Sequence, residues 1–356
     1  MKTTDTDTFG GRFRALNENL DPADFAMVMS TGIVSVALHL LGFGTPATVL
    51  FWINIAMFVV LWPLYLLKLV RFPRRMLADF RGHASGPGFL TIVAGTCILG
   101  NQYAVLTQDF ALAHALFWLG VCCWAFLLWG VFYAIFTVEE KPPLSRGING
   151  AWLVATVSTQ SIVILGATIA DKAGWNPEIA FFLFCALFLL GVMLYIFVIT
   201  VIFFRFCFAK MTPAELDPTY WINAGAVAIS TLAGATLILK NGASPMLDHF
   251  MPYIKGTTLL TWATASWWVP LLLLLGFWRH VVRRYPLTYT PAFWGMVFPM
   301  GMYTACTVTF SEALGFGWLM VVPRWFLAVA FGAWVATFVG MLISRVRLLF
   351  VGPRQA

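Results

Sequence analysis

Residues 291–311, PAFWGMVFPMGMYTACTVTFS, decide the fold class. The stretch is long and apolar enough to cross a bilayer, which takes about 20 such residues. Yet Phe298 and Pro299 stand at its middle. A proline inside a helix removes one backbone hydrogen bond and clashes with the preceding turn, so a bend is predicted. Because lipid tolerates such a break where the helix is buried in protein or lines a cavity, we expect this helix to line a pore, with Phe298 projecting into it.

The rest of the chain has the composition of an integral membrane protein. Of its 356 residues, 60% are hydrophobic and 10% are charged, against about 25% charged in soluble domains. The first 24 residues are polar and carry no evident cleaved signal peptide. We therefore expect a cytoplasmic N-terminal segment (1–24), a transmembrane transport domain (25–344) and a cytoplasmic C-terminal tail (345–356). Ten spanning helices are predicted, at about 25–43, 48–70, 87–106, 112–137, 149–170, 178–206, 221–240, 256–280, 291–311 and 319–344.

The basic residues predict the orientation of these helices. All but four of the 22 Lys and Arg residues fall in the two terminal segments and in the loops on the same side as them. The exceptions are Lys172, Lys240, Lys255 and Arg324. Since positive charge stays on the cytoplasmic side, we expect a multi-pass protein of the plasma (inner) membrane with both termini in the cytoplasm.

Odd- and even-numbered helices differ in composition. The odd helices are markedly richer in Gly, Ala, Ser and Thr, whereas Leu, Phe, Val and Trp dominate the even ones. Small residues allow close helix packing in lipid, and bulky apolar residues suit a lipid-facing surface. The prediction is an all-α membrane fold of five helical hairpins, with an inner ring of odd helices around a central pore and quasi-five-fold symmetry.

Each odd helix also carries small or hydroxyl residues near its midpoint, and these are the predicted pore lining. The alternative for these small and hydroxyl residues is that they only allow the inner helices to pack into a solid core. The alternative for Phe298 is that its side chain packs toward an outer helix and does not enter a pore. The predicted lining consists of Ser30, Thr31, Gly32, Gly95, Thr96, Ser158, Thr159, Gln160, Ser230, Thr231 and Thr304.

The chemistry of such a pore favours anions. No Asp, Glu, Lys or Arg lies in the middle of any predicted helix, so ion-pair coupling inside the membrane is not indicated. Helix N-termini and a basic rim favour anions, and a large ring such as Phe298 can gate by occlusion and dewetting. No nucleophile–base spacing, metal cluster or cofactor motif is present, so neither an enzyme, a metal nor a cofactor is predicted.

Three stretches resemble the tellurite-resistance/dicarboxylate transporter family, which includes malate permeases, sulfite efflux pumps and the plant slow-type anion channels. They are DFAMVMSTGI at 24–33, PTYWINAGA at 218–226 and WGMVFPM at 294–300. The resemblance implies ten helices about a central pore, a homotrimer, and a gating phenylalanine that falls on Phe298, followed by Pro299 as in the plant branch. We expect no counterpart of the long regulatory tails of the plant channels, because about 24 residues precede the first predicted helix and roughly ten follow the last.

The predicted function is transport of C4-dicarboxylates such as malate and succinate, or of small inorganic anions such as tellurite, sulfite, chloride or nitrate. One alternative is a proton-coupled carrier on the same fold, with Glu312, Asp171 or His39 near the outer mouth as coupling groups. A second is a membrane-embedded redox enzyme, which would need paired histidines that the sequence does not supply. The expected partners are the anionic solute, the lipid bilayer and further copies of the chain, and nucleic acid is not expected.

Overall fold

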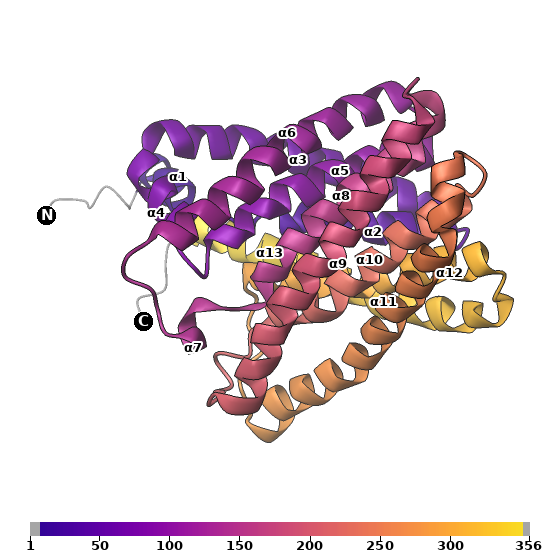
Figure 1. Cartoon of the computed structure of the whole chain (residues 1–356). Coiled ribbons are helices and arrows are strands. Elements are labelled where there is room, and N and C mark those ends of the chain that lie inside the picture. Colours follow the sequence, from indigo (N-terminus) through magenta and orange to yellow (C-terminus); the bar gives the residue numbers. More distant parts are fainter. Residues whose placement is uncertain (1–7, 352–356) are drawn as a thin grey trace, which may run out of the picture.

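The computed structural model describes residues 8–351, without the side chains of Leu349 and Val351, and helices make up most of it (Figure 1). No strand occurs within these residues. The long helices are α2 (Ala26–Leu40), α3 (Gly44–Arg71), α5 (Thr91–Gln102), α6 (Phe110–Thr137), α8 (Val154–Ile169), α9 (Pro177–Phe208), α10 (Ile222–Leu239), α11 (Pro245–Phe277), α12 (Trp294–Leu314) and α13 (Val321–Val346). Eight helical stretches in the described residues are long and apolar enough to cross a membrane, and Ala26–Leu40 is a shorter apolar helix.

Two classes of helix follow from composition, as predicted. In an apolar 18-residue segment of each of the stretches that contain α5, α8 and α10, 83 to 89% of residues are buried. In α3, α6, α9, α11 and α13 the buried share is only 22 to 33%. The helices α2 and α12 also bury nearly every side chain. Small residues therefore mark the inner helices and bulky apolar residues mark an outer layer that faces away from the protein.

The inner helices contact one another in a closed order: α2 with α5, α5 with α8, α8 with α10, α10 with α12, and α12 with α2. Each also packs against the outer helix that follows it in the chain, namely α3, α6, α9, α11 and α13 respectively. Glycine permits the closest approach between neighbours. A Cβ on Gly150, at the start of the third inner stretch, would lie 2.0 Å from the carbonyl oxygen of Thr219 at the start of the fourth.

Several boundaries differ from the sequence-based expectations. The helix α11 begins at Pro245, about three turns before the predicted start at 256, and the Ser244 side chain caps it by accepting from Leu247 N. Pro252 lies within this added stretch. Pro299 likewise lies within a continuous α12. Three short helices outside the apolar segments were not predicted: α1 (Phe9–Glu18), α4 (Pro73–Arg81) and α7 (Leu144–Gly147). All three lie at the same end of the bundle (Figure 1), which we call the basic end.

Candidate functional site

The inner helices start alike, at the basic end. Four of them are preceded by a short 3₁₀ turn (Gly86–Leu90, Gly150–Leu153, Pro218–Trp221, Pro291–Phe293), and the first by turns at residues 22–25. Each start has a polar residue, then Pro or Gly, and an aromatic or Leu a few positions later. The five segments are DPADF (21–25), SGPGF (85–89), NGAWL (149–153), DPTYW (217–221) and TPAFW (290–294). This repeat is visible in the sequence, and the prediction missed it by attending to the helix midpoints.

The five starts surround one cavity of about 300 Å³, which we call the vestibule. Its deepest lining residues are Met29, Thr91, Val154, Ile222 and Gly295, one from each inner helix. Towards the basic end the lining consists mostly of small or polar residues: Asp21, Ala23, Ala26, Ala84, Ser85, Gly88, Asn149, Ala151, Thr219, Pro291 and Ala292. The vestibule thus lies on the axis of the inner ring, at the N-terminal end of every helix in it.

Helix starts of this kind favour negative charge, because their first backbone N–H groups have no partner within the helix. Side chains cap some of these donors. Asp21 Oδ1 accepts from Ala23 N at 2.8 Å, and Asn149 Oδ1 accepts from Ala151 N at 3.0 Å. Asp21 is the one ionisable side chain among the described residues that line the vestibule. The cavity therefore combines five positive helix ends with a single carboxylate.

Phe298 lies one helical turn beyond Gly295, on the same side of α12 as that lining residue. Its side chain is fully buried. A Cβ on Gly225 of α10 would meet Cδ1 of the Phe298 ring at 3.1 Å and Cγ of Pro299 at 2.7 Å. Gly225 likewise lies three residues, about one helical turn, beyond the lining residue Ile222. The ring of Phe298 therefore packs between α12 and α10, and Phe298 is not itself among the residues that line the vestibule.

Four of the predicted lining side chains turn toward the outer helices. Trp334 Nε1 of α13 donates to Thr31 Oγ1 at 2.9 Å. Trp124 Nε1 of α6 donates to Thr159 Oγ1 at 3.0 Å. The two remaining contacts are Gln160 Nε2 to the Phe188 carbonyl of α9 at 2.9 Å and Thr231 Oγ1 to Thr261 Oγ1 of α11 at 3.0 Å. These groups connect the inner ring to the outer helices across the membrane interior.

Three other predicted residues lie between neighbouring inner helices. The Ser30 hydroxyl donates to the Trp294 carbonyl of α12 at 2.7 Å. A Cβ on Gly32 would meet Ile98 Cγ2 of α5 at 2.6 Å, and one on Gly95 would meet Val28 of α2 at 3.3 Å. They allow the ring to close tightly.

The remaining four hydroxyls bond to their own helices. Thr96, Ser158, Ser230 and Thr304 each donate to a backbone carbonyl three or four residues earlier. Ser158 is four residues beyond the lining residue Val154, and so it continues the vestibule face of α8. All four are fully buried. Because each hydroxyl hydrogen is already donated, these groups offer oxygen lone pairs rather than donors.

The groups considered for proton coupling lie at the opposite ends of the inner helices. His39 and Glu312 are exposed, in the last turns of α2 and α12. Asp171 follows α8 and pairs with Lys240, which follows α10. None of the three lines the vestibule.

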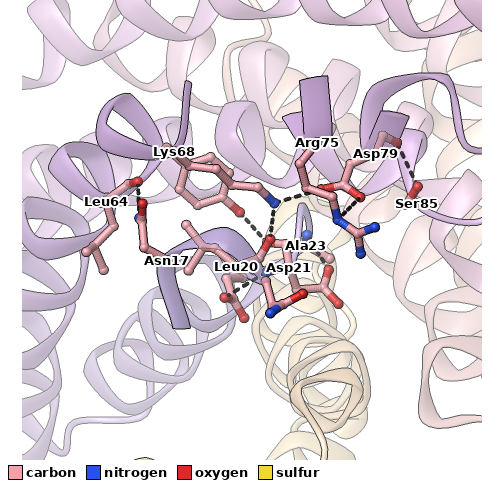
Figure 2. Close-up of polar contacts among 12 residues, drawn as sticks. Asn17, Leu20, Asp21, Ala23, Leu64, Lys68, Arg75, Asp79 and Ser85 are labelled. Atoms are coloured by element: carbon pink, nitrogen blue, oxygen red, sulfur yellow. Dashed lines mark hydrogen bonds and ion pairs between the residues drawn. The ribbon is translucent and has the colours of Figure 1, made fainter. Parts of the chain in front are cut away.

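A buried polar cluster holds two of the five starts in place (Figure 2). Lys68 of α3 is buried, and its Nζ donates to the Leu20 carbonyl and to Asp79 Oδ2, both at 2.7 Å. Ser85 Oγ, in the vestibule lining, donates to the Asp79 carbonyl at 2.6 Å. Tyr65 Oη donates to the Asp21 carbonyl at 2.5 Å. The outer helix α3 and the short helix α4 thereby position the first and second starts.

Asp24 is the buried carboxylate beside this cluster, just before α2. Burial is the main reason that its pKa is raised to about 6, with the charge of Asp21 adding to the effect. The positive charge of Arg345, at the end of α13 and 3.5 Å from Asp24, lowers the pKa of Asp24 and so limits this rise. The charge of Lys68 has a smaller effect in the same direction. Asp24 thus titrates in a range where an ordinary aspartate is fully ionised.

A ring of small-residue helices enclosed by lipid-facing helices defines a multi-pass membrane protein, and the comparisons identify its family. The chain belongs to the voltage-dependent anion channel family, whose model matches residues 19–342, so the predicted family relationship is confirmed. It is similar to an uncharacterized transporter of Methanocaldococcus jannaschii, with 23% identity over 94% of this chain and 96% of that protein. A second uncharacterized transporter of that organism is 26% identical, over 85% of this chain and 90% of the relative. An uncharacterized membrane protein of Mycobacterium tuberculosis is 34% identical over 42% of this chain and 75% of its own length.

Proposed function

We propose that the chain conducts small anions through the axis of the inner ring, entering or leaving at the vestibule. The observation that carries this proposal is the vestibule itself: five helix starts converge on one cavity, and Phe298 lies one turn beyond it. Positive helix ends attract anions, and membership of an anion-channel family supports the same conclusion.

In this proposal all ten long helices span the membrane as five hairpins with quasi-five-fold symmetry. The closed contact order of the inner helices supports that arrangement. The basic end faces the cytoplasm of a cell whose plasma (inner) membrane holds the protein, because nearly all Lys and Arg lie on that side. By family resemblance, the functional unit is a homotrimer with one pore in each subunit.

Phe298 is the proposed gate, with Pro299 fixing the backbone at its base. The pathway lining that we retain is Ser158 together with Thr96, Ser230 and Thr304, whose hydroxyls bond only to their own helices. The four residues directed at outer helices are assigned to packing instead, as are Ser30, Gly32 and Gly95. A lining of this kind binds a solute weakly, because it offers neither charge nor free donors.

The substrate class is C4-dicarboxylates or small inorganic anions. A panel of malate, succinate, sulfite, chloride, nitrate and tellurite in proteoliposomes, with and without an imposed pH gradient, tests this proposal. Anion flux that persists without the gradient is expected. Uptake that requires the gradient would favour the proton-coupled carrier, and flux of cations but not anions would refute the proposal.

A further inference from the structure

The short helix α4 has one apolar and one basic side. Pro73, Met76, Leu77 and Phe80 recur at the spacing of a single helix face. Arginines occupy most of the remaining surface: Arg74, Arg75 and Arg81, with Arg71 at the end of α3 just before it. All four are exposed. Of these four arginines, only Arg75 has a carboxylate of residues 8–351 within ion-pair distance, namely Asp79 Oδ1 at 3.7 Å.

The apolar face of α4 covers one end of a groove of about 460 Å³ between α3 and α6. The groove is lined almost entirely by apolar side chains: Trp62, Tyr65, Leu66, Leu69, Pro73, Met76, Leu77, Phe80, Phe89, Ile92 and Leu127. Leu66 and Leu69 are at least half exposed, so the groove opens on the outer surface of the bundle. In a membrane this surface faces lipid.

Arg74, Leu77 and Arg81 lie along one stripe of α4, three and four residues apart. Because Leu77 lines the groove, two unpaired guanidinium groups flank its rim at the basic end. Guanidinium groups match phosphate oxygens in shape and charge. An apolar groove that ends at two arginines matches a molecule with an acyl chain and an anionic headgroup.

We propose that this groove binds an anionic glycerophospholipid, with an acyl chain between α3 and α6 and the phosphate at Arg74 and Arg81. The positive charges of Arg74 and Arg81 at the rim favour an anionic lipid over a second copy of the chain as the occupant. A lipid of the same leaflet brings a phosphate to the level of α4, whereas the groove itself offers a protein partner no polar group to bind.

The position of α4 gives the bound lipid a route to the vestibule, and this step rests on the proposed function. Asp79 of α4 holds Lys68, and the Asp79 carbonyl accepts the hydroxyl of Ser85 in the vestibule lining (Figure 2). A lipid that fixes α4 therefore fixes the second start of the inner ring. Anion flux is expected to rise with the anionic lipid content of the membrane.

The experiment measures lipid retention by native mass spectrometry on the full-length protein, after exchange into vesicles of phosphatidylcholine with phosphatidylglycerol. The variant R74Q/R81Q should lose phosphatidylglycerol by about five-fold for each arginine removed. The control R283Q/R284Q removes the same charge from exposed positions after α11 and should retain the lipid. Leu66→Trp, which fills the groove and keeps every arginine, should also lose it.

Equal retention by R74Q/R81Q and the unaltered protein would overturn the site, and so would an equal loss in the R283Q/R284Q control. Retention by Leu66→Trp would refute acyl binding in the groove. A change of oligomeric size in R74Q/R81Q with retention unchanged would make α4 a contact between copies instead. Lipid retention can be measured whether or not the protein transports anions. If R74Q/R81Q loses the lipid but its anion flux still rises with anionic lipid content, only the coupling between the groove and the vestibule is refuted.

Discussion

Phe298→Ala tests the proposed gate, and α12 supplies a matched control. Phe298 and Phe310 lie on the same helix, 0% and 1% exposed. The ring of Phe310, however, stacks on Trp262 of the outer helix α11, with centroids 5.6 Å apart and planes 16° apart. Truncation of either ring should lower the free energy of unfolding by about 3–5 kcal/mol, as is typical of a buried Phe. The two variants therefore share the loss of packing and differ in which side of α12 is emptied.

Only Phe298→Ala should raise anion flux. Its ring packs between α12 and α10, one turn beyond the vestibule residue Gly295, and its removal opens space beside Gly225 and Pro299. Each 1.4 kcal/mol taken from a barrier raises the rate about ten-fold. An apolar constriction that excludes a hydrated anion presents a barrier larger than this, so an increase of at least about ten-fold is expected for Phe298→Ala.

The assay is chloride or nitrate efflux from proteoliposomes at equal protein content, with thermal unfolding in detergent recorded for each variant. Equal flux increases in Phe298→Ala and Phe310→Ala would show that loosening of α12, and not opening of a gate, is responsible. No increase in Phe298→Ala, with the protein folded and inserted, would remove Phe298 from the pathway.

Three further predictions concern neighbouring groups. Gly225→Ala should lower flux several-fold in the unaltered protein, because the new Cβ would lie 2.7 Å from Cγ of Pro299 and 3.1 Å from Cδ1 of Phe298, so that the Phe298 ring must shift. In the Phe298→Ala background the reduction should be smaller, because only the contact with Pro299 remains, and an equal reduction in both backgrounds would contradict this explanation. Ser158→Val should alter anion flux. Thr159→Val should leave flux unchanged but lower the free energy of unfolding by about 1–3 kcal/mol, because Trp124 loses its hydrogen-bond partner. Efflux and melting experiments that give the opposite pattern would reverse the assignment of these two residues to the vestibule face and the outer face. Because the pKa of Asp24 is raised to about 6 in the folded state, the folded state loses stability as pH rises from about 4 to about 6 and this carboxyl ionises. Asp24→Asn removes that loss, so it should stabilise the protein above pH 6 by as much as about 3 kcal/mol. Melting temperatures of both proteins across pH check this: the difference should vanish below pH 4, and a constant difference at all pH values would refute it.

The division into inner and outer helices could be predicted from sequence because it depends on composition alone. Small residues are abundant wherever a helix touches protein on all sides, and this holds for α2, α5, α8, α10 and α12 regardless of how each is rotated. The hydrophobic periodicity adds little, because an inner helix is apolar all round.

The direction of each hydroxyl could not be predicted for the same reason. Ser158 and Thr159 are adjacent, and a helix turns by about 100° per residue. One continues the vestibule face, and the other bonds to Trp124 of an outer helix. The outward-facing hydroxyls would have been recognisable only from their partners, since three of the outer helices place a Trp near the middle of the membrane opposite an inner Thr. The pairs are Trp334 with Thr31, Trp124 with Thr159, and Trp262 with Thr307.

The outward hydrogen bonds also bear on how an anion would be selected. With Thr31, Thr159 and Thr231 bonded to the outer helices, the middle of the inner ring has few groups that could coordinate a dehydrated anion. In the proposed pathway, discrimination between anions would then come from the vestibule, where helix ends attract negative charge, and from the space beside Phe298. Asp21 opposes the helix ends at that mouth, because its carboxylate repels anions while capping Ala23. In the proposed pathway, the balance between these charges would set how strongly the mouth concentrates anions, and the size of the opening at Phe298 would set which of them pass.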